Sequence, residues 1–152
     1  MRTANALTEL SERLQRLEDL EAIRRLYVDY GRHLDDCDPV AYASLFARDA
    51  KLRLGPVLRA DGREEIEQAA NQMLGNLAAR EEKRSVHLID TPRIELSGDT
   101  ASGECVWAAI SRGTDGTESS IRVGRHVDEL VREDGLWRFA VRRGFMDIGA
   151  LG

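Results

Sequence analysis

The order of the predicted elements places the chain in the α+β class. Apolar residues recur every three or four positions over residues 7–34 and again over residues 61–77, which is the helical period. Beyond residue 85 they fall in short alternating runs separated by turns that contain glycine, which is typical of antiparallel strands. Helices first and antiparallel strands afterwards predict a single α+β domain over residues 1–152, an ordinary length for one hydrophobic core.

The first predicted helix is long and carries an apolar stripe. The stripe comprises Leu7, Leu10, Leu14, Leu17, Leu20, Ile23, Leu26, Tyr30 and Leu34. Because residues 7–17 are polar or charged outside that stripe, its first half needs a partner surface. That surface is either the domain's own sheet or another subunit.

Turn signals divide the middle of the chain. Asp38 before Pro39 predicts the N-cap and first position of a short helix that ends near Asp49. A strand over residues 50–54 follows. The next helix begins at Asp61 and has acidic residues in its first turn, where the helix dipole favours them.

The last part of the chain predicts one sheet. Its strands are expected at residues 85–96, with an interruption at Pro92, and at 101–110, 121–131 and 136–146. Residues 101–110 carry apolar side chains on both faces, Cys105 and Trp107 on one and Val106 and Ile110 on the other. Helices can cover only one face, so we predict a homodimer or higher homo-oligomer built on the convex face of the sheet.

Charge and composition exclude several classes of protein. Asp and Glu number 27 against 22 Lys and Arg, and no block of like charge stands out, which disfavours nucleic acid as a partner. The longest apolar runs are four or five residues, too short to cross a membrane, and the N-terminus has no signal-peptide core. Cys37 and Cys105 match no metal or redox spacing, so reduced thiols in a cytoplasmic protein are expected.

The motifs of cofactor and metal binding are missing from the sequence. No glycine-rich phosphate loop follows a predicted strand, no nucleophile elbow occurs, and no His, Cys and carboxylate residues have metal-ligand spacing. We therefore expect no cofactor and no metal. Any catalysis is expected to use acid–base side chains.

Each of the three histidines has a functional and a structural interpretation. His87 lies on a half-apolar face of its strand, which suits a ligand pocket and equally a core histidine bonded to a backbone carbonyl. His126 is interpreted as a surface or interface residue. His33 is interpreted as a structural group beside the negative end of the helix dipole.

Other polar candidates also leave alternatives open. The acidic run that begins at Asp35 is either a solvated turn or the source of a carboxylate that orients a histidine. A straight helix turns Asp35 about 140° away from Tyr30, so the two line one cavity only if the helix ends or bends between them. Arg142 and Arg143 point to opposite faces of the last strand. One of them is expected in a pocket and the other at a rim or interface.

Several segments in a fixed order carry a resemblance to a known family. They are residues 21–30 (EAIRRLYVDY) with Leu34 and Asp35, 45–50 (LFARDA), 62–66 (GREEI), 85–87 (SVH), 94–101 (IELSGDTA), 124–130 (GRHVDEL) and 134–139 (DGLWRF) with Arg142. Together they resemble the SnoaL-like family of the nuclear-transport-factor-2-like superfamily. The resemblance implies a cone, a curved antiparallel sheet wrapped round a long N-terminal helix with a cavity at its wide end. It begins near Leu14, so residues 1–13 are expected to form a peripheral helical extension.

The resemblance also implies a site. In the branch with scytalone dehydratase, bile-acid dehydratase and hexachlorocyclohexane dehydrochlorinase, an Asp at the end of the first helix pairs with a His on the first long strand. Asp35 and His87 stand at these positions. Tyr30 stands where the dehydratases have a Tyr. Arg142 stands where the family pattern has an Arg, five residues after the Trp of the last strand. The chain lacks the second His of scytalone dehydratase and the inward Asp of ketosteroid isomerase on residues 101–110, which leaves the substrate open.

Three hypotheses follow for the function. In the first, a cofactor-free lyase acts on a small cyclic or polycyclic apolar substrate. His87, made more basic by Asp35, removes a proton from carbon, Tyr30 assists the departing oxygen, and Arg142 stabilises negative charge. In the second, an isomerase or polyketide-cyclase-type enzyme uses the same dyad. In the third, the chain is a non-catalytic small-molecule-binding or partner-subunit domain.

Overall fold

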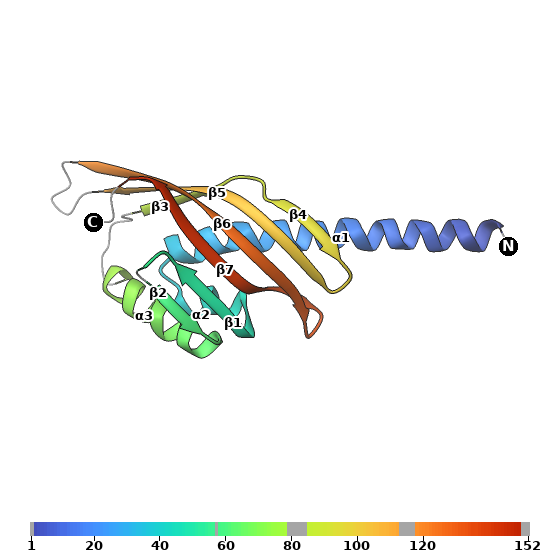
Figure 1. Ribbon diagram of the computed structural model, residues 1–152, viewed down its shortest axis with the longest axis horizontal. Coiled ribbons are helices and arrows are strands. Elements are labelled where there is room, and N and C mark those ends of the chain that lie inside the picture. The colour runs from blue at the N-terminus through green and yellow to red at the C-terminus, as the bar shows by residue number, and fades with distance from the viewer. Residues whose placement is uncertain (1, 57, 79–84, 113–117, 150–152) are drawn as a thin grey trace.

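A long helix and a curved, unclosed sheet build the molecule (Figure 1). The computed structural model describes residues 2–56, 58–78, 85–112 and 118–149, and over these residues seven strands form one sheet. The helices are α1 (Arg2–Asp35), α2 (Pro39–Ser44) and α3 (Arg63–Ala78). The strands are β1 (Phe46–Leu54), β2 (Leu58–Asp61), β3 (Ser85–Ile89), β4 (Arg93–Ser97), β5 (Thr100–Arg112), β6 (Ser119–Glu133) and β7 (Leu136–Ile148). The α+β class is thereby confirmed.

The sheet is mixed, whereas the sequence predicted an antiparallel one. Its order is β2-β1-β7-β6-β5-β3, with β4 also paired to β5. The strands β1 and β7 run parallel, and the other described pairs are antiparallel. Parallel pairing arises because the chain between β1 and β7 crosses the whole sheet before it returns beside β1, which a two-residue hairpin cannot do.

Two boundaries in the middle of the chain differ from the prediction. Asp38 caps α2 as expected, since its Oδ1 accepts a hydrogen bond of 2.9 Å from the Ala41 N–H. The helix nevertheless ends at Ser44, and β1 begins at Phe46, because this end of the strand pairs with β7 and buries its side chains in the core. The short strand β2 was not predicted. The expected charged end of the helix over residues 80–84 lies outside the described residues.

A β-bulge at Ala140 decides which side chains of β7 face the interior. The register of β7 against β6 shifts there, so the alternation of inward and outward positions is reset. Phe139 before the bulge and Arg142 after it are both buried, whereas Arg143 is exposed. Strict alternation had grouped Arg143 with Phe139. Of the two arginines, Arg142 is therefore the interior one.

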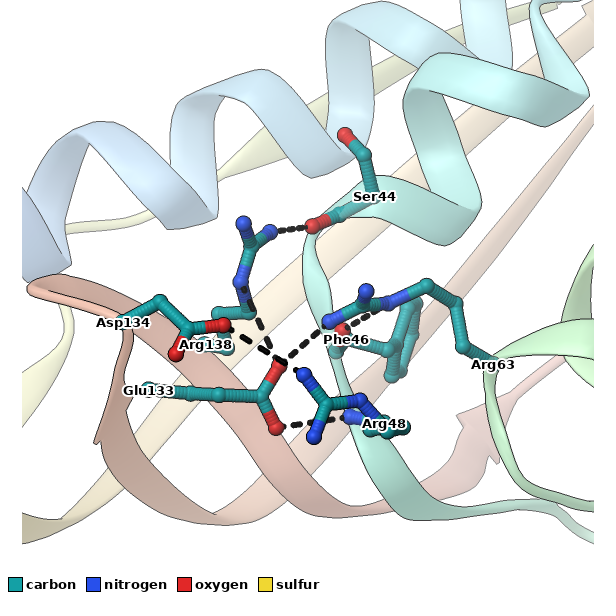
Figure 2. Close-up of polar contacts among 7 residues, drawn as sticks. All are labelled: Ser44, Phe46, Arg48, Arg63, Glu133, Asp134 and Arg138. Carbon is teal, nitrogen blue, oxygen red and sulfur yellow. Dashed lines mark hydrogen bonds and ion pairs between the residues drawn. The ribbon is translucent and has the colours of Figure 1, made fainter.

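A cluster of charged side chains around Glu133 fixes the β6–β7 hairpin to the middle of the chain (Figure 2). The Glu133 carboxylate accepts a hydrogen bond of 2.9 Å from the Arg48 backbone N–H and one of 2.6 Å from Arg63 Nη2. Arg63 Nε in turn donates to the Phe46 carbonyl at 2.8 Å, and Arg138 donates to the Ser44 carbonyl. The Arg48 N–H, followed by the Arg63 guanidinium, holds the pKa of Glu133 below its usual value.

Only the second half of α1 packs against the sheet. Ile23, Tyr27 and Tyr30 are buried in the core, but residues 3–18 are exposed and project beyond the strands (Figure 1). The first half of the leucine stripe therefore does not lie on the domain's own sheet. The helix reaches the sheet at Asp19, whose Oδ1 accepts hydrogen bonds from Arg132 at 2.7 Å and from the Trp137 indole at 3.0 Å.

The face of the sheet turned away from α1 carries an exposed apolar patch, here called the outer sheet patch. Its members are Val86, Leu88, Val106, Ile110, Ile121, Phe145 and Ile148. Val86, Ile110 and Ile121 lie directly opposite one another across β3, β5 and β6.

Within the described ranges, no helix is long and apolar enough to cross a bilayer.

Candidate active site

Asp35 and His87 form a close pair between the end of α1 and β3. The distance from His87 Nδ1 to Asp35 Oδ1 is 2.7 Å, and both side chains are largely buried. The His87 backbone N–H also points at this carboxylate, 3.1 Å from Oδ1 and 3.0 Å from Oδ2. The carboxylate can only accept, so Nδ1 carries the ring hydrogen and Nε2 is left with a free lone pair.

A glycine lets α1 come close enough for this pair to form. Gly31 faces β3 one turn before Asp35, and a Cβ there would lie 3.2 Å from Ile89 Cδ1 and 3.5 Å from His87 Cβ. A larger side chain would have to displace the end of the Ile89 side chain or move α1 away from the strand. Because Asp35 is the last residue of α1, its carboxylate extends beyond the final turn towards His87.

Tyr30 points into the core. Its ring contacts those of Tyr42 and Phe139, with centroids 5.1 and 6.1 Å away. The Tyr30 hydroxyl oxygen accepts a hydrogen bond of 3.3 Å from the Tyr42 O–H, which leaves its own hydrogen free to donate. Burial raises the pKa of Tyr30 more than nearby Arg142 lowers it, so the phenol stays protonated. The helix is continuous from Tyr30 to Asp35, and the structure gives no direct contact between these two side chains.

Arg142 is fully buried and paired with Asp128. Its Nε and Nη2 donate to the two carboxylate oxygens at 2.8 and 2.7 Å, and the Tyr27 hydroxyl donates to Asp128 Oδ2 at 2.6 Å. The guanidinium carbon lies 3.9 Å from the ring centroid of Phe139 and 4.1 Å from that of Tyr30. Burial alone would lower the pKa of Arg142, but Asp128 raises it above its usual value. Among the described residues, Arg142 Nη1 has no hydrogen-bond partner.

His126 is buried beside Tyr30 and Trp107, so its interpretation as a surface residue was wrong. It is 5% exposed, its ring meets that of Tyr30 edge to face at 5.2 Å, and it stacks on Trp107 at 5.8 Å. Burial lowers the pKa of His126 well below 6.5, and the positive charge of nearby Arg142 lowers it further. His126 is therefore a neutral imidazole near neutral pH.

The interior position of His126 and Asp128 could have been inferred from their neighbours on β7, but not from the alternation of residues along β6 alone. His126 and Asp128 share a face of β6, and their direct neighbours on β7 are Gly144 and Arg142. A Cβ on Gly144 would lie 3.3 Å from His126 Cδ2, so the glycine makes room for the ring. A charged pair beside a His–Gly pair indicates an interior polar row, but only once the bulge in β7 is known.

The described residues contain no metal-ligand cluster, and the groove between α1 and the segment after β3 is not lined by Tyr30, Asp35, His87 or Arg142. In the part of the chain that the structure describes, no three His, Cys, Asp or Glu side chains gather as metal ligands. A groove of about 240 Å³ runs between α1 and the segment after β3, lined by Arg24, Val28 and Ile89 among others. None of the four predicted site residues lines it.

Comparison with known proteins now defines the class. The SnoaL-like domain family matches residues 15–143, and the chain belongs to this family. No curated protein is significantly similar to it in sequence. Three of the solved structures that share the fold show the likeness.

The first is a scytalone dehydratase-like protein from Novosphingobium aromaticivorans, with 27% identity, a TM-score of 0.76, and coverage of 88% of this chain and 87% of the other. An NTF2-like protein with a cystatin-like fold from the same organism has 26% identity, a TM-score of 0.82, and coverage of 95% and 92%. A hexachlorocyclohexane dehydrochlorinase has 26% identity, a TM-score of 0.77, and coverage of 89% of both chains.

Proposed function

We propose that the protein is a cofactor-independent lyase in which His87 is the general base and Asp35 orients it. The observation that carries this proposal is the carboxylate held by both the backbone N–H and the Nδ1 of His87, which fixes the tautomer with Nε2 as proton acceptor. The likeness to a dehydratase-like protein and a dehydrochlorinase supports it, because both names denote an elimination.

The proposed reaction is a proton abstraction coupled to loss of a neighbouring group. His87 Nε2 takes a proton from carbon, the C–H electron pair becomes a carbon–carbon double bond, and the leaving group departs with its bonding electrons. The imidazolium that forms is stabilised by the Asp35 carboxylate 2.7 Å away. When the leaving group is hydroxide, the proton held by His87 or by Tyr30 completes a molecule of water.

Tyr30 and Arg142 act on the leaving side in this proposal. Tyr30 remains a protonated phenol. Because Tyr42 donates to the Tyr30 oxygen, the hydroxyl hydrogen of Tyr30 is free to be donated to a departing oxygen. Asp128 already balances the charge of Arg142, and Nη1 is the donor left to stabilise developing negative charge. Aromatic side chains around Tyr30 favour a small cyclic or polycyclic apolar substrate.

A product screen tests the proposed function. The purified protein is incubated with hydroxylated aromatic, steroid and polyketide-like compounds and with hexachlorocyclohexane, and products are measured by mass spectrometry. A lyase yields a product lighter by one water or one hydrogen chloride, and His87→Ala abolishes it. A product of unchanged mass that carries solvent deuterium assigns the isomerase or cyclase reaction instead. Binding without turnover, equal in the wild type and in His87→Ala, would leave a binding domain.

The same proposal extends to assembly and location. A second copy is proposed to cover the outer sheet patch, because seven large apolar side chains on one sheet face exceed what a soluble monomer ordinarily leaves in water. A cytoplasmic location is proposed because Cys37 and Cys105 are free thiols, which a reducing compartment preserves.

A further inference from the structure

The projecting half of α1 carries a leucine stripe that nothing in the domain covers. Leu7, Leu10, Leu14 and Leu17 are between 55% and 63% exposed. All described side chains from residue 3 to residue 18 are exposed, up to the anchor at Asp19. An isolated helix of this length is marginal in water, so a folded projection of this kind needs a packing partner.

The stripe is separate from the core-facing side of the same helix. At 100° per residue, the four leucines are centred roughly 150° away from Ile23, Tyr27 and Tyr30. The leucines therefore cannot be an extension of the face that packs on the sheet. Their spacing of three, four and three residues matches the a and d positions of a heptad, with Leu7 and Leu14 at a and Leu10 and Leu17 at d.

The charges beside the stripe favour a second copy in parallel orientation. In this heptad Arg13 occupies g and Glu18 occupies the e position five residues later. A parallel coiled coil sets each g position against the following e position of its partner, so Arg13 of each copy faces Glu18 of the other. An antiparallel coil sets g against g and e against e, which gives neither residue an opposite charge.

The free length of the helix matches the length that such a coil can use. The next a and d positions are Glu21 and Arg24, which in register would set like charges against each other, so the seam ends at Leu17. Glu21, Arg24 and Val28 lie on the side of α1 that stays exposed along the domain. Two helices paired through the leucines can therefore diverge there without meeting either sheet.

We propose that two copies of the chain associate through a parallel, in-register coiled coil of residues 7–18. This contact is distinct from the outer sheet patch, which lies on β3 and β5–β7. It is also independent of the proposed lyase chemistry, because none of its residues contacts Asp35 or His87. The arrangement tethers two domains at the same end of their helices.

Disulfide trapping tests the proposal. Leu10→Cys is made in a Cys37→Ser background, which removes the accessible native thiol. In a parallel, in-register coil residue 10 faces residue 10 of the partner at a separation a disulfide can span, so mild oxidation should give a covalent dimer at micromolar concentration. Glu12→Cys, at the f position on the opposite side of the helix, is the matched control and should remain a monomer on a denaturing gel. Equal trapping of both variants, or of neither, would overturn the proposal.

Charge variants and mass measurements separate this contact from others. Arg13→Glu should lower the rate of trapping at least severalfold, and Arg13→Glu combined with Glu18→Arg should restore it. Leu10→Glu with Leu14→Glu should halve the mass by sedimentation while the domain stays folded by circular dichroism. An unchanged mass would contradict the coil. The Leu10→Cys variant should trap equally well with and without His87→Ala, so failure of the lyase assay leaves this result unaffected.

Discussion

At the scale of single residues, Asp35 and His87 carry the proposed chemistry. The pair joins a helix terminus to a strand 52 positions later, and the carboxylate binds both the ring and the backbone of the same histidine. An acceptor held on two sides cannot rotate away when the ring becomes charged. This geometry is what the proposed proton abstraction requires.

Replacing the carboxylate by an amide tests the orienting role of Asp35. Asp35→Asn should lower kcat by about 10²- to 10⁴-fold with KM little changed, because the amide no longer fixes the tautomer or stabilises the imidazolium. The neighbouring Asp36→Asn is the control and should keep wild-type turnover. Steady-state kinetics on whichever compound the screen identifies gives the comparison. An Asp35→Asn enzyme with wild-type kcat would remove the dyad from the mechanism.

The buried pair of Arg142 and Asp128 belongs to this scale as well. Asp128→Asn leaves the guanidinium uncompensated in the core and should destabilise the fold by about 3–5 kcal/mol. Arg142→Met combined with Asp128→Leu removes both charges and should recover much of that loss. Urea unfolding followed by circular dichroism measures the difference. Equal destabilisation in the single and the double variant would contradict this account of a charge-balanced pair.

At the scale of elements, the sequence predicted the helices and most strands but not the details that assemble the site. Amphipathic periodicity found α1 and α3, and alternation with turns found β5, β6 and β7. The bulge at Ala140 has no periodic signal, and it decides that Arg142 is inside. Asp35 and His87 were paired through a family resemblance, because no local pattern reports a contact between residues so far apart.

The β6–β7 hairpin should be held to β1 by a pH-dependent contact. The folded-state pKa of Glu133 is lowered, so its contribution is present above the unfolded pKa and is lost as pH falls through the folded value. Glu133→Gln should therefore lower Tm at pH 7, which corresponds to about 1–3 kcal/mol of stability. The deficit should be smaller near pH 3, because protonation of Glu133 removes the same contact there. Glu95→Gln, an exposed change on β4, should leave Tm unchanged at both values. A deficit in Glu133→Gln that is the same at both pH values would contradict the electrostatic cause.

At the scale of the whole molecule, apolar surface predicts assembly. The outer sheet patch and the leucine stripe lie on different elements, so each can be removed alone. Ile110→Glu places a charge in the middle of the row formed with Val86 and Ile121, and it should lower the mass by light scattering at micromolar concentration. The control, Ser102→Glu on the exposed part of β5 beside β4, should keep the wild-type mass. A wild-type mass in Ile110→Glu would count against a second copy on this face.

The position of His87 on β3 has a further consequence, for aggregation. Since β3 is the last strand in the sheet order, its outer edge would present unpaired backbone groups to any passing strand. On that edge the His87 N–H already donates to the Asp35 carboxylate, and α1 lies against the strand at Gly31. The carboxylate that orients the histidine therefore also blocks edge-to-edge addition. Removal of the Asp35 side chain, as in Asp35→Ala, is therefore expected to free the His87 N–H on this edge and to remove the contact proposed to orient the ring.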